Sequence, residues 1–248
     1  MIHVLINGCN GRMGQEVIHT INGFEDLKII AGFDRSDNNL MDFPVYTNID
    51  NIKEKPDVII DFSVPISTLN ILKYAKETCT PIVIATTGFT EEELNIIDDY
   101  SKSIPIFKSA NMSFDINIMA KMASELATKL KDTDIEIIET HHNQKIDSPS
   151  GTAILLADSI NNALDKKMNY EFNRHDKKSK RGINEIGFSN IRGGNIVGEH
   201  TIKFFGSNET FEITHTTYSR SVFAEGALKA ALFIYNKPTG KYDMNDLI

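Results

Sequence analysis

The sequence predicts an α/β protein with a doubly wound parallel sheet, followed by a smaller α+β domain. Three observations predict this fold class. The first hundred residues alternate short apolar runs with longer segments of helical period, and a glycine-rich turn directly follows the first apolar run. Beyond Asn111, strands separated by glycine-containing turns replace that alternation.

The strands expected in the first domain are short and rich in Ile and Val, as is typical of strands that are buried on both faces. They cover residues 2–7, 28–33, 57–62, 81–85 and 104–107. Helices are expected at residues 12–22, 66–77 and 90–101. Thr90 and Glu93 have the spacing of a capping box at the start of the last helix. These repeated units favour a parallel sheet with right-handed crossovers.

The second domain is expected to begin with a long helix and a strand, at residues 117–130 and 134–141. A turn-rich segment and a helix over residues 152–164 follow. Strands at residues 185–191, 196–205 and 210–218 then suit an antiparallel sheet. A last helix is expected over residues 223–235, and the sequence leaves its docking place open.

Composition excludes several classes of protein. The 248 residues are 41% hydrophobic and 24% charged, which is typical of a folded chain and not of a disordered or collagen-like one. The net charge of -8 would repel a phosphate backbone, so we expect no nucleic-acid partner. Cys9 and Cys79 are too few for a disulfide framework. With no export signal and no long apolar run, we expect a cytoplasmic protein without a membrane partner.

Three glycines favour a phosphate-binding turn between the first strand and the first helix. Gly8, Gly11 and Gly14 form the pattern G-x-x-G-x-x-G, where missing side chains allow a tight turn and a close approach of backbone amides to a pyrophosphate. The spacing differs from the commoner G-x-G-x-x-G. The alternative is a sharp turn that needs only one glycine at positive φ.

Asp34 and Arg35 end the second predicted strand and strengthen the nucleotide interpretation. Asp34 lies 20 residues after Gly14, where a carboxylate can accept hydrogen bonds from a ribose 2′-hydroxyl. Arg35 can instead bind a 2′-phosphate, so the pair leaves both NADH and NADPH open. The alternative for this pair, and for Arg12 in the loop, is solvated surface charge.

Small and hydroxyl residues follow the next three strands. In an open parallel sheet the ligand lies beyond the carboxyl ends of the strands, so these positions are candidates for contact with a planar ring and its carboxamide. Each tripeptide or tetrapeptide can equally be a turn or a helix cap. The segments are Asp61-Phe62-Ser63, Ala85-Thr86-Thr87-Gly88 and Ser109-Ala110-Asn111.

A second cluster lies between the strand at residues 134–141 and the helix that follows it. His141 and His142 are neighbours near the strand end, so they point to opposite faces and need not serve the same purpose. Histidine suits proton delivery near neutral pH, and Lys145 can neutralise a bound carboxylate or activate an imine. We therefore expect acid chemistry here.

The start of that helix is a candidate carboxylate site. Ser150, Gly151 and Thr152 offer free amides, two hydroxyls and the positive end of a helix dipole. The alternative is plain N-capping by Ser150 or Thr152. No metal is expected, because the adjacent histidines lack zinc-type spacing and no cysteine is near.

With these residues in view, the sequence resembles the 4-hydroxy-tetrahydrodipicolinate reductase family, formerly called dihydrodipicolinate reductase. The similarity runs nearly end to end, and the histidine segment is its most diagnostic part. The motifs are Gly8-Cys9-Asn10-Gly11-Arg12-Met13-Gly14, Thr86-Thr87-Gly88, Ala110-Asn111-Met112-Ser113, His141-His142 through Lys145 to Asp147-Ser148-Pro149-Ser150-Gly151-Thr152, Arg192-Gly193-Gly194, Gly198-Glu199-His200 and Tyr242-Asp243-Met244-Asn245-Asp246.

The resemblance implies an NAD(P)H-dependent oxidoreductase acting on a CH-CH group in diaminopimelate and lysine biosynthesis. It implies a Rossmann-like cofactor domain (1–112), a smaller α+β substrate and oligomerisation domain (113–221), a terminal helix and tail returning to the first domain (222–248), and a homotetramer. Hydride would reach C4 of the ring that remains after water is lost, with protonation at C3.

The resemblance also implies roles for individual residues. His141 matches the proton donor, assisted by Lys145, and the dicarboxylate would contact His142, Lys145, Ser150, Gly151 and Thr152. The implied contacts to NADH or NADPH are Gly8, Asn10, Gly11, Arg12, Met13, Gly14, Asp34, Arg35, Phe62, Ser63, Thr86, Thr87, Gly88, Ala110, Asn111 and Met112.

Three departures from the family pattern bear on affinity rather than on reaction type. Gln144 replaces a basic residue that is found in many members. Ala85 replaces a glycine that often precedes Thr86-Thr87-Gly88, and Asp115 replaces a glycine that is common at its position.

Rival interpretations are another two-domain dehydrogenase of the amino-acid or aspartate type and a sensor of dinucleotide redox state. The basic segment at residues 174–181 is expected to be a solvated loop.

Overall fold

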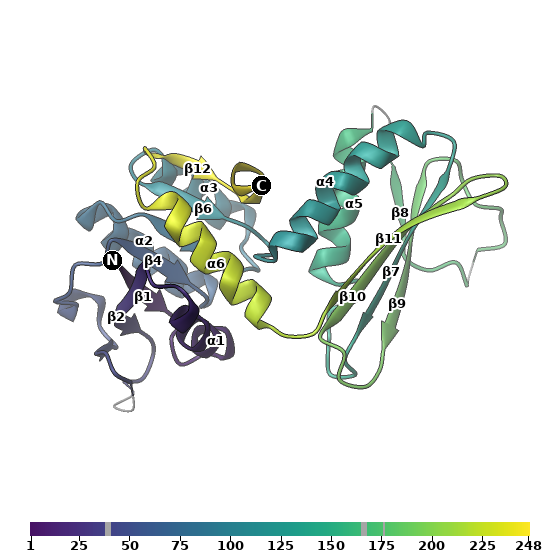
Figure 1. The fold of residues 1–248 in the computed structure, drawn as a ribbon. Helices are drawn as coiled ribbons and strands as arrows, with labels where there is room; N and C mark the ends of the chain where they lie inside the picture. The colour runs from purple at the N-terminus through teal and green to yellow at the C-terminus, as the bar shows by residue number, and fades with distance from the viewer. Residues whose placement is uncertain (38–40, 165–167, 176) are drawn as a thin grey trace. The chain divides into compact units, whose positions relative to one another are not determined.

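The computed structural model describes residues 1–37, 41–164, 168–175 and 177–248. The chain forms two compact units, shown in Figure 1. Unit 1 combines Met1–Phe114 with Arg220–Ile248, and unit 2 is Asp115–Ser219. Within the described ranges, no helix is long and apolar enough to cross a membrane.

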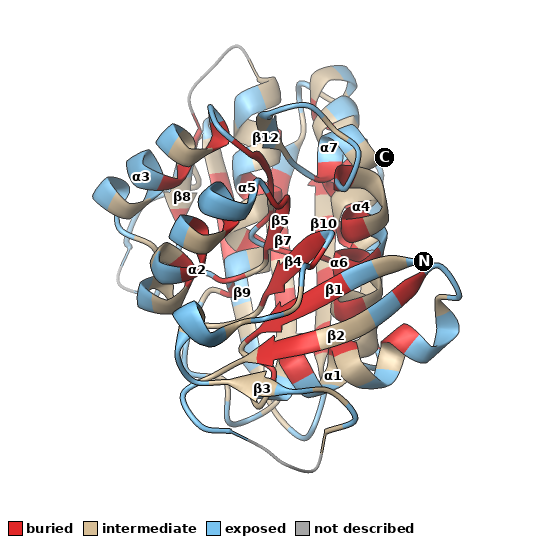
Figure 2. Cartoon of the chain, turned by 90° about the vertical axis from the view of Figure 1, so that its left-hand side faces the viewer, coloured by how far each residue is buried: buried red, intermediate tan, exposed pale blue. Residues whose placement is uncertain are grey.

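Unit 1 is built on a seven-stranded sheet whose strands are all parallel, as the apolar runs predict. The strand order is β12-β6-β5-β4-β1-β2-β3, so the chain changes direction across the sheet between β1 and β4. The strands are β1 (Ile2–Asn7), β2 (Leu27–Phe33), β3 (Val45–Tyr46), β4 (Val58–Asp61), β5 (Ile82–Ile84), β6 (Pro105–Lys108) and β12 (Gly240–Tyr242). Figure 2 shows the buried strands at the centre of this unit.

Helices cover both faces of this sheet. They are α1 (Arg12–Thr20), α2 (Pro65–Thr78), α3 (Glu91–Ser101), α6 (Ser221–Ile234) and α7 (Met244–Leu247), with short 3-10 turns η1 (Ile21–Gly23) and η2 (Ile49–Asn51). Alternate residues of β1 explain the two layers. Val4 and Ile6 join the core with α6, whereas Leu5 joins the core with α2 and α3. The predicted capping box is confirmed, since Thr90 and Glu93 each accept the other's backbone N–H.

Helix α6 comes from the far end of the chain and packs against α1, β4 and β5. Most of its buried residues are small, including Ala224, Gly226 and Ala227, which lets its backbone lie close to the sheet. The docking place that the sequence left open is therefore in unit 1. The helix predicted over residues 12–22 is shorter, because the chain tightens into η1 after Thr20.

Unit 2 has a five-stranded sheet in the order β11-β10-β7-β9-β8. Its elements are α4 (Phe114–Lys129), β7 (Asp134–His141), α5 (Gly151–Ala163), β8 (Asn169–Glu171), β9 (Glu185–Arg192), β10 (Gly198–Phe205) and β11 (Thr210–Thr217). The expectation of an antiparallel sheet is wrong for half of it. β10 pairs antiparallel with β7 and β11, but β7 and β8 both run parallel to β9. The chain from β7 to β9 includes α5, which is long enough for a crossover connection.

One face of the unit 2 sheet is covered by α4 and α5, which lie on the same side of it in Figure 1. Along β7, the alternation buries Ile135, Ile137, Glu139 and His141 on that face. Two apolar residues thus lead into two polar ones at the end of the strand. This places a carboxylate and an imidazole side by side beneath the start of α5.

Candidate active site

The glycine turn of unit 1 has the geometry that its sequence predicts. Gly8 has φ +83°, and its carbonyl accepts the N–H of Gly11 at 3.0 Å. A side chain at Gly14 would overlap that same carbonyl, so the start of α1 packs directly on the turn. Gly11 is the N-cap of α1 and no side chain caps the helix, which leaves its first amides for another acceptor.

Asp34 fastens this turn to the end of β2. Its Oδ2 accepts the backbone N–H of Asn10 at 2.9 Å, and its Oδ1 accepts that of Arg35 at 2.7 Å. The side-chain Nδ2 of Asn10 in turn donates to the backbone carbonyl of Ser36 at 2.8 Å. The predicted nucleotide residues Asn10, Asp34 and Arg35 therefore lie together, and the Arg35 side chain is exposed.

Asp61, which the sequence placed in a candidate segment after the third predicted strand, is a buried carboxylate that organises the ends of β1 and β4. It accepts hydrogen bonds from Asn7 Nδ2 (2.8 Å), Ser63 Oγ (2.5 Å) and Thr68 Oγ1 (2.6 Å). Burial raises the pKa of Asp61, and these neutral donors only partly offset the effect. Ser63 then donates its N–H to Thr86 at 2.9 Å, which joins β4 to the segment after β5.

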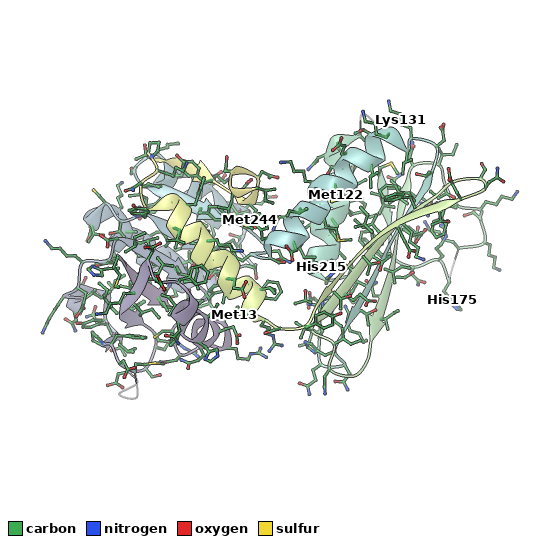
Figure 3. The ribbon with its side chains drawn as sticks, viewed as in Figure 1. Met13, Met122, Lys131, His175, His215 and Met244 are labelled. Atoms are coloured by element: carbon green, nitrogen blue, oxygen red, sulfur yellow. The ribbon has the colours of Figure 1, made fainter. Side chains whose placement is uncertain are left out.

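The remaining predicted cofactor residues are placed as follows. Thr86, Asn111 and Met112 are buried, whereas Arg12, Thr87, Gly88 and Ala110 are exposed, and Met13, labelled in Figure 3, is half-buried with Phe62 and Ser63. Gly88 has φ +84° and open space around it. All of these candidates belong to unit 1. Their contact with a dinucleotide stays a prediction.

The histidine and lysine segment lies in unit 2 between β7 and α5. His141 is the last residue of β7 and is buried, while His142 is half-buried, as expected for neighbours on a strand. Backbone bonds tie this end to the turn after β9, from Gly193 N to His141 O at 2.9 Å and from His142 N to Ile196 O at 2.8 Å. The turn between β9 and β10 thus holds the backbone of both histidines.

His141 is held by a buried ion cluster. Its Nδ1 contacts Oε2 of Glu139, a residue with no solvent exposure. Arg192 on β9 binds both oxygens of Glu139, at 2.8 Å to Oε2 and 2.7 Å to Oε1. Burial acts to raise the pKa of Glu139, but hydrogen bonds from His141 and Arg192 outweigh it and lower the pKa to about 2. Glu139 is therefore an anion at neutral pH.

Ser150 joins this cluster to helix α5 and to a third histidine. As N-cap it accepts the N–H of Ala153 at 3.1 Å, so the capping that the sequence left open as the alternative occurs at Ser150. Its own N–H donates to Oε1 of Glu139 at 3.2 Å, and its Oγ lies 3.0 Å from His200 Nε2. The His200 ring stands edge-to-face to that of His141, with centroids 5.1 Å apart.

His200 is neutral near pH 7 because burial, together with a smaller effect of the nearby His141, lowers its pKa to about 3. Its neighbour across the β10–β11 pair is His215, labelled in Figure 3. Nδ1 of His200 is buried without a hydrogen-bond partner among the residues that the structure describes. The end of the unit 2 sheet that holds His141 thus also carries His200, an imidazole that stays uncharged at neutral pH.

Lys145 lies in the loop before α5 and forms an ion pair with Asp147 at 2.9 Å. Asp147 is exposed; partial desolvation acts to raise its pKa, but the hydrogen bond and charge of Lys145 lower it overall. Gly151 is exposed and Thr152 half-buried in the first turn of α5. The structure therefore brings His141, His142 and Lys145 to the same end of the unit 2 sheet as this turn.

Glu139, Arg192 and His200 are the site residues that sequence reasoning missed. Glu139 had a usable signal, since it precedes His141 by two on a strand and must share its face. Arg192 and His200 stood in the quoted motifs without a role. Gln144 is exposed, and Asp115 lies in the first turn of α4, where a negative charge suits the helix dipole. Neither contradicts the site.

The described part of the basic segment at residues 174–181 is a surface loop that ion pairs and hydrogen bonds hold to the rest of unit 2. Asp176 of this segment lies outside the described residues. Arg174 pairs with Glu185 at 2.9 Å, and Arg181 donates to the carbonyls of Ile135 and Glu185. Such pairing leaves fewer free cations for a phosphate backbone.

Comparison with known proteins gives two matching family models. "Dihydrodipicolinate reductase, N-terminus" matches residues 2–112, and "Dihydrodipicolinate reductase, C-terminus" matches residues 115–248. A 4-hydroxy-tetrahydrodipicolinate reductase of Clostridium tetani (strain Massachusetts / E88) is 49% identical, over 100% of this chain and 97% of the relative. Another, from Caldanaerobacter subterraneus subsp. tengcongensis, is 47% identical over 100% and 98%.

A solved structure agrees with these sequence relatives. The dipicolinate-bound dihydrodipicolinate reductase from Paenisporosarcina sp. TG-14 is 26% identical, with a TM-score of 0.82 and 99% of each chain covered. Family models over almost the whole chain, a close full-length relative and a matching fold thus agree, and the chain belongs to the dihydrodipicolinate reductase family.

Proposed function

We propose that this protein is a 4-hydroxy-tetrahydrodipicolinate reductase, which uses NADH or NADPH and releases water to form tetrahydrodipicolinate in diaminopimelate and lysine biosynthesis. Family membership supports the reaction class. The observation that carries the proposal is the buried cluster of His141, Glu139 and Arg192 beside Lys145 and the first turn of α5. It combines a proton donor with an anion-binding surface.

The residues of unit 1 fit a dinucleotide. The left-handed Gly8, the contact of Gly14 with the turn and the uncapped start of α1 form a cradle for a pyrophosphate. Asp34 already accepts two backbone N–H groups, and a carboxylate has lone pairs left for a ribose hydroxyl. A bound reduced nicotinamide supplies the hydride for C4 of the ring.

The residues of unit 2 suit a dicarboxylate. Amides of Gly151 and Thr152 in the first turn of α5, the hydroxyl of Thr152 and the cation of Lys145 are donors suited to one or both carboxylates, and Asp147 already interacts with the Gly151 amide and with Lys145. His142 is the remaining proposed contact. A substrate carboxylate would compete with Asp147 for Lys145, because the two are chemically alike.

His141 would deliver the proton to C3. Because Glu139 holds its Nδ1, the Nε2 atom is the one left for transfer, and a side chain at Gly198 would come within 3.1 Å of that atom. The glycine keeps the space beside Nε2 free. Lys145 assists by stabilising negative charge on the ring.

We further propose a cytoplasmic homotetramer, with the dinucleotide bound by residues 1–112 and the substrate by residues 113–221. The unit 2 sheet leaves the face opposite α4 and α5 uncovered by any described helix, with Ile191 and Phe205 exposed on it. Light scattering of the purified protein measures the number of subunits, and a monomer would contradict this part.

The proposal is tested by the loss of reduced-nicotinamide absorbance when freshly made substrate is added. Turnover is expected with NADH, NADPH or both, and parallel initial rates give the preference. A flat trace with intact cofactor binding would overturn the enzyme assignment and favour a redox sensor. Turnover of an amino acid or aspartate instead would favour the rival dehydrogenases.

A further inference from the structure

The Glu139 carboxylate has a donor at each of four positions. Oε2 accepts from His141 Nδ1 and from Arg192 Nη1 at 2.8 Å, while Oε1 accepts from Arg192 Nη2 at 2.7 Å and from Ser150 N at 3.2 Å. Two of these donors belong to one guanidinium in a bidentate pair. Both the position and the charge of the carboxylate are therefore fixed by residues that come from three segments.

This arrangement determines which nitrogen of His141 exchanges its proton. An anionic acceptor at Nδ1 keeps a proton on that atom in both the neutral and the charged ring. Transfer is then confined to Nε2. Without such an acceptor the ring can adopt either tautomer, and a fraction of molecules would present the wrong nitrogen.

Arg192 limits the electrostatic effect of the carboxylate. A buried anion next to an imidazole favours the charged ring and makes it a poor proton donor. The guanidinium offsets that charge, since it lies on the same two oxygens. Glu139 with Arg192 thus orients the ring while adding little net charge beside it.

Glu139 and Arg192 are the charged groups in the cluster that holds His141, and the other titratable groups nearby are neutral or paired elsewhere. His200 on β10 meets the ring edge-to-face and is neutral near pH 7, and His215 on β11 lies one strand further. Lys145 and Asp147 in the loop before α5 form their own ion pair. Ser150 at the start of α5 is uncharged.

We propose that Glu139 and Arg192 are positioning residues that together set the tautomer and the proton affinity of His141. This deepens the proposed function and rests on it in one respect, the use of His141 as the acid. The pair predicts opposite effects when its two members are neutralised separately.

The test is the pH dependence of kcat/KM for Glu139→Gln and Arg192→Gln. Loss of the anion should move the alkaline limb to lower pH, and loss of the cation should move it to higher pH, each by about one pH unit. Arg192→Lys keeps the charge and should restore the wild-type limb. In all three, kcat should fall more than binding of dipicolinate, used as a planar dicarboxylate probe.

Glu185→Gln is the matched control, because it breaks an Arg–Glu pair with Arg174 at the other end of β9. It should leave the pH profile unshifted even if it lowers stability. Limbs that coincide with wild type, or that shift in the same direction in both neutral variants, overturn the proposal.

Nitrogen NMR of labelled histidine decides the matter independently of turnover, with His141→Gln assigning the signal. The wild-type ring should carry its proton on Nδ1, and Glu139→Gln should populate the Nε2 tautomer. An unchanged tautomer overturns the positioning role. Absent turnover by the wild type, with the NMR result as expected, would instead overturn only the proposed function.

Discussion

Two buried carboxylates respond differently to burial because their partners differ. Asp61 is surrounded by neutral donors, so burial raises its pKa. Glu139 is equally enclosed, but hydrogen bonds from His141 and from the Arg192 guanidinium outweigh burial and lower its pKa to about 2. The neutral donors around Asp61 only partly offset its lost hydration, whereas the donors around Glu139, one of them a cation, outweigh it. A buried carboxyl group thus links the ends of β1 and β4 in unit 1, and as an anion holds His141 in unit 2.

His141→Gln should lower kcat by about 10² to 10⁴ with a much smaller change in KM, because a proton donor acts mainly in the transition state. Lys145→Ala should impair both constants. Steady-state kinetics on purified protein measures this, with dipicolinate binding as a check on the site. Unchanged turnover in His141→Gln would require another acid.

Asp34→Ala should reduce kcat/KM with NADH about tenfold more than with NADPH, since one charge-assisted hydrogen bond to a ribose hydroxyl is lost. Both values fall to some extent, because Asp34 also holds the N–H of Asn10. Asp34→Asn retains an oxygen for that N–H and separates the two roles. Equal losses in paired assays would argue against a ribose contact.

At the scale of elements, α6 shows how one small residue permits a close helix contact. A Cβ at Gly226 would overlap the carbonyl oxygen of Met112, in the segment after β6. The helix pays the lower propensity of glycine and gains an approach that no other residue allows. Because Met112 is also a proposed cofactor residue, this contact with α6 helps to hold the segment after β6 in place.

Gly226→Ala should destabilise the protein by about 3 kcal/mol, despite the better helix propensity of alanine, because backbone atoms must shift. Chemical denaturation measures the change in unfolding free energy. Gly23→Ala is the control, since nothing lies within 4 Å of a Cβ there. A stability loss of equal size in both variants would show that the contact with Met112 is not responsible.

For the whole molecule, the buried groups of unit 2 set the response to acid. The folded pKa of His200 is about 3 and that of Glu139 about 2, below their ordinary values of 6.5 and 4.5. In both cases the unfolded chain binds the proton more tightly. Stability should therefore fall as pH drops below 6.5 through His200, and below 4.5 through Glu139 as well. Asp61 acts in the opposite direction, because its folded pKa is raised.

His200→Gln should flatten the loss of stability between about pH 6 and pH 4, where one proton contributes a slope of up to about 1.4 kcal/mol per pH unit. Denaturation curves across this range, compared with wild type, isolate the group from Asp61. His19→Gln, on an exposed position of α1, should keep the wild-type slope. A parallel pair of curves for wild type and His200→Gln would contradict a neutral buried His200.

Local patterns determined much of this protein from the sequence alone. The period of the apolar residues, the three glycines after β1 and the spacing of Thr90 and Glu93 all act within a few residues, so they predict strands, turn and capping box correctly. The histidine and lysine segment is equally local. Its residues are contiguous, so chain connectivity already places them between a strand and a helix.

Tertiary structure decided what depends on distant pairing. The edge strands β3, β8 and β12 are two or three residues long and exist because a neighbour supplies their hydrogen bonds. β9 runs parallel to β7 because the connection through α5 brings the chain back to the end of the sheet at which β7 begins. Arg192 reaches Glu139 across 53 residues of chain, and no periodicity specifies that contact, because only the alignment of β7 with β9 brings the two side chains to one end of the sheet.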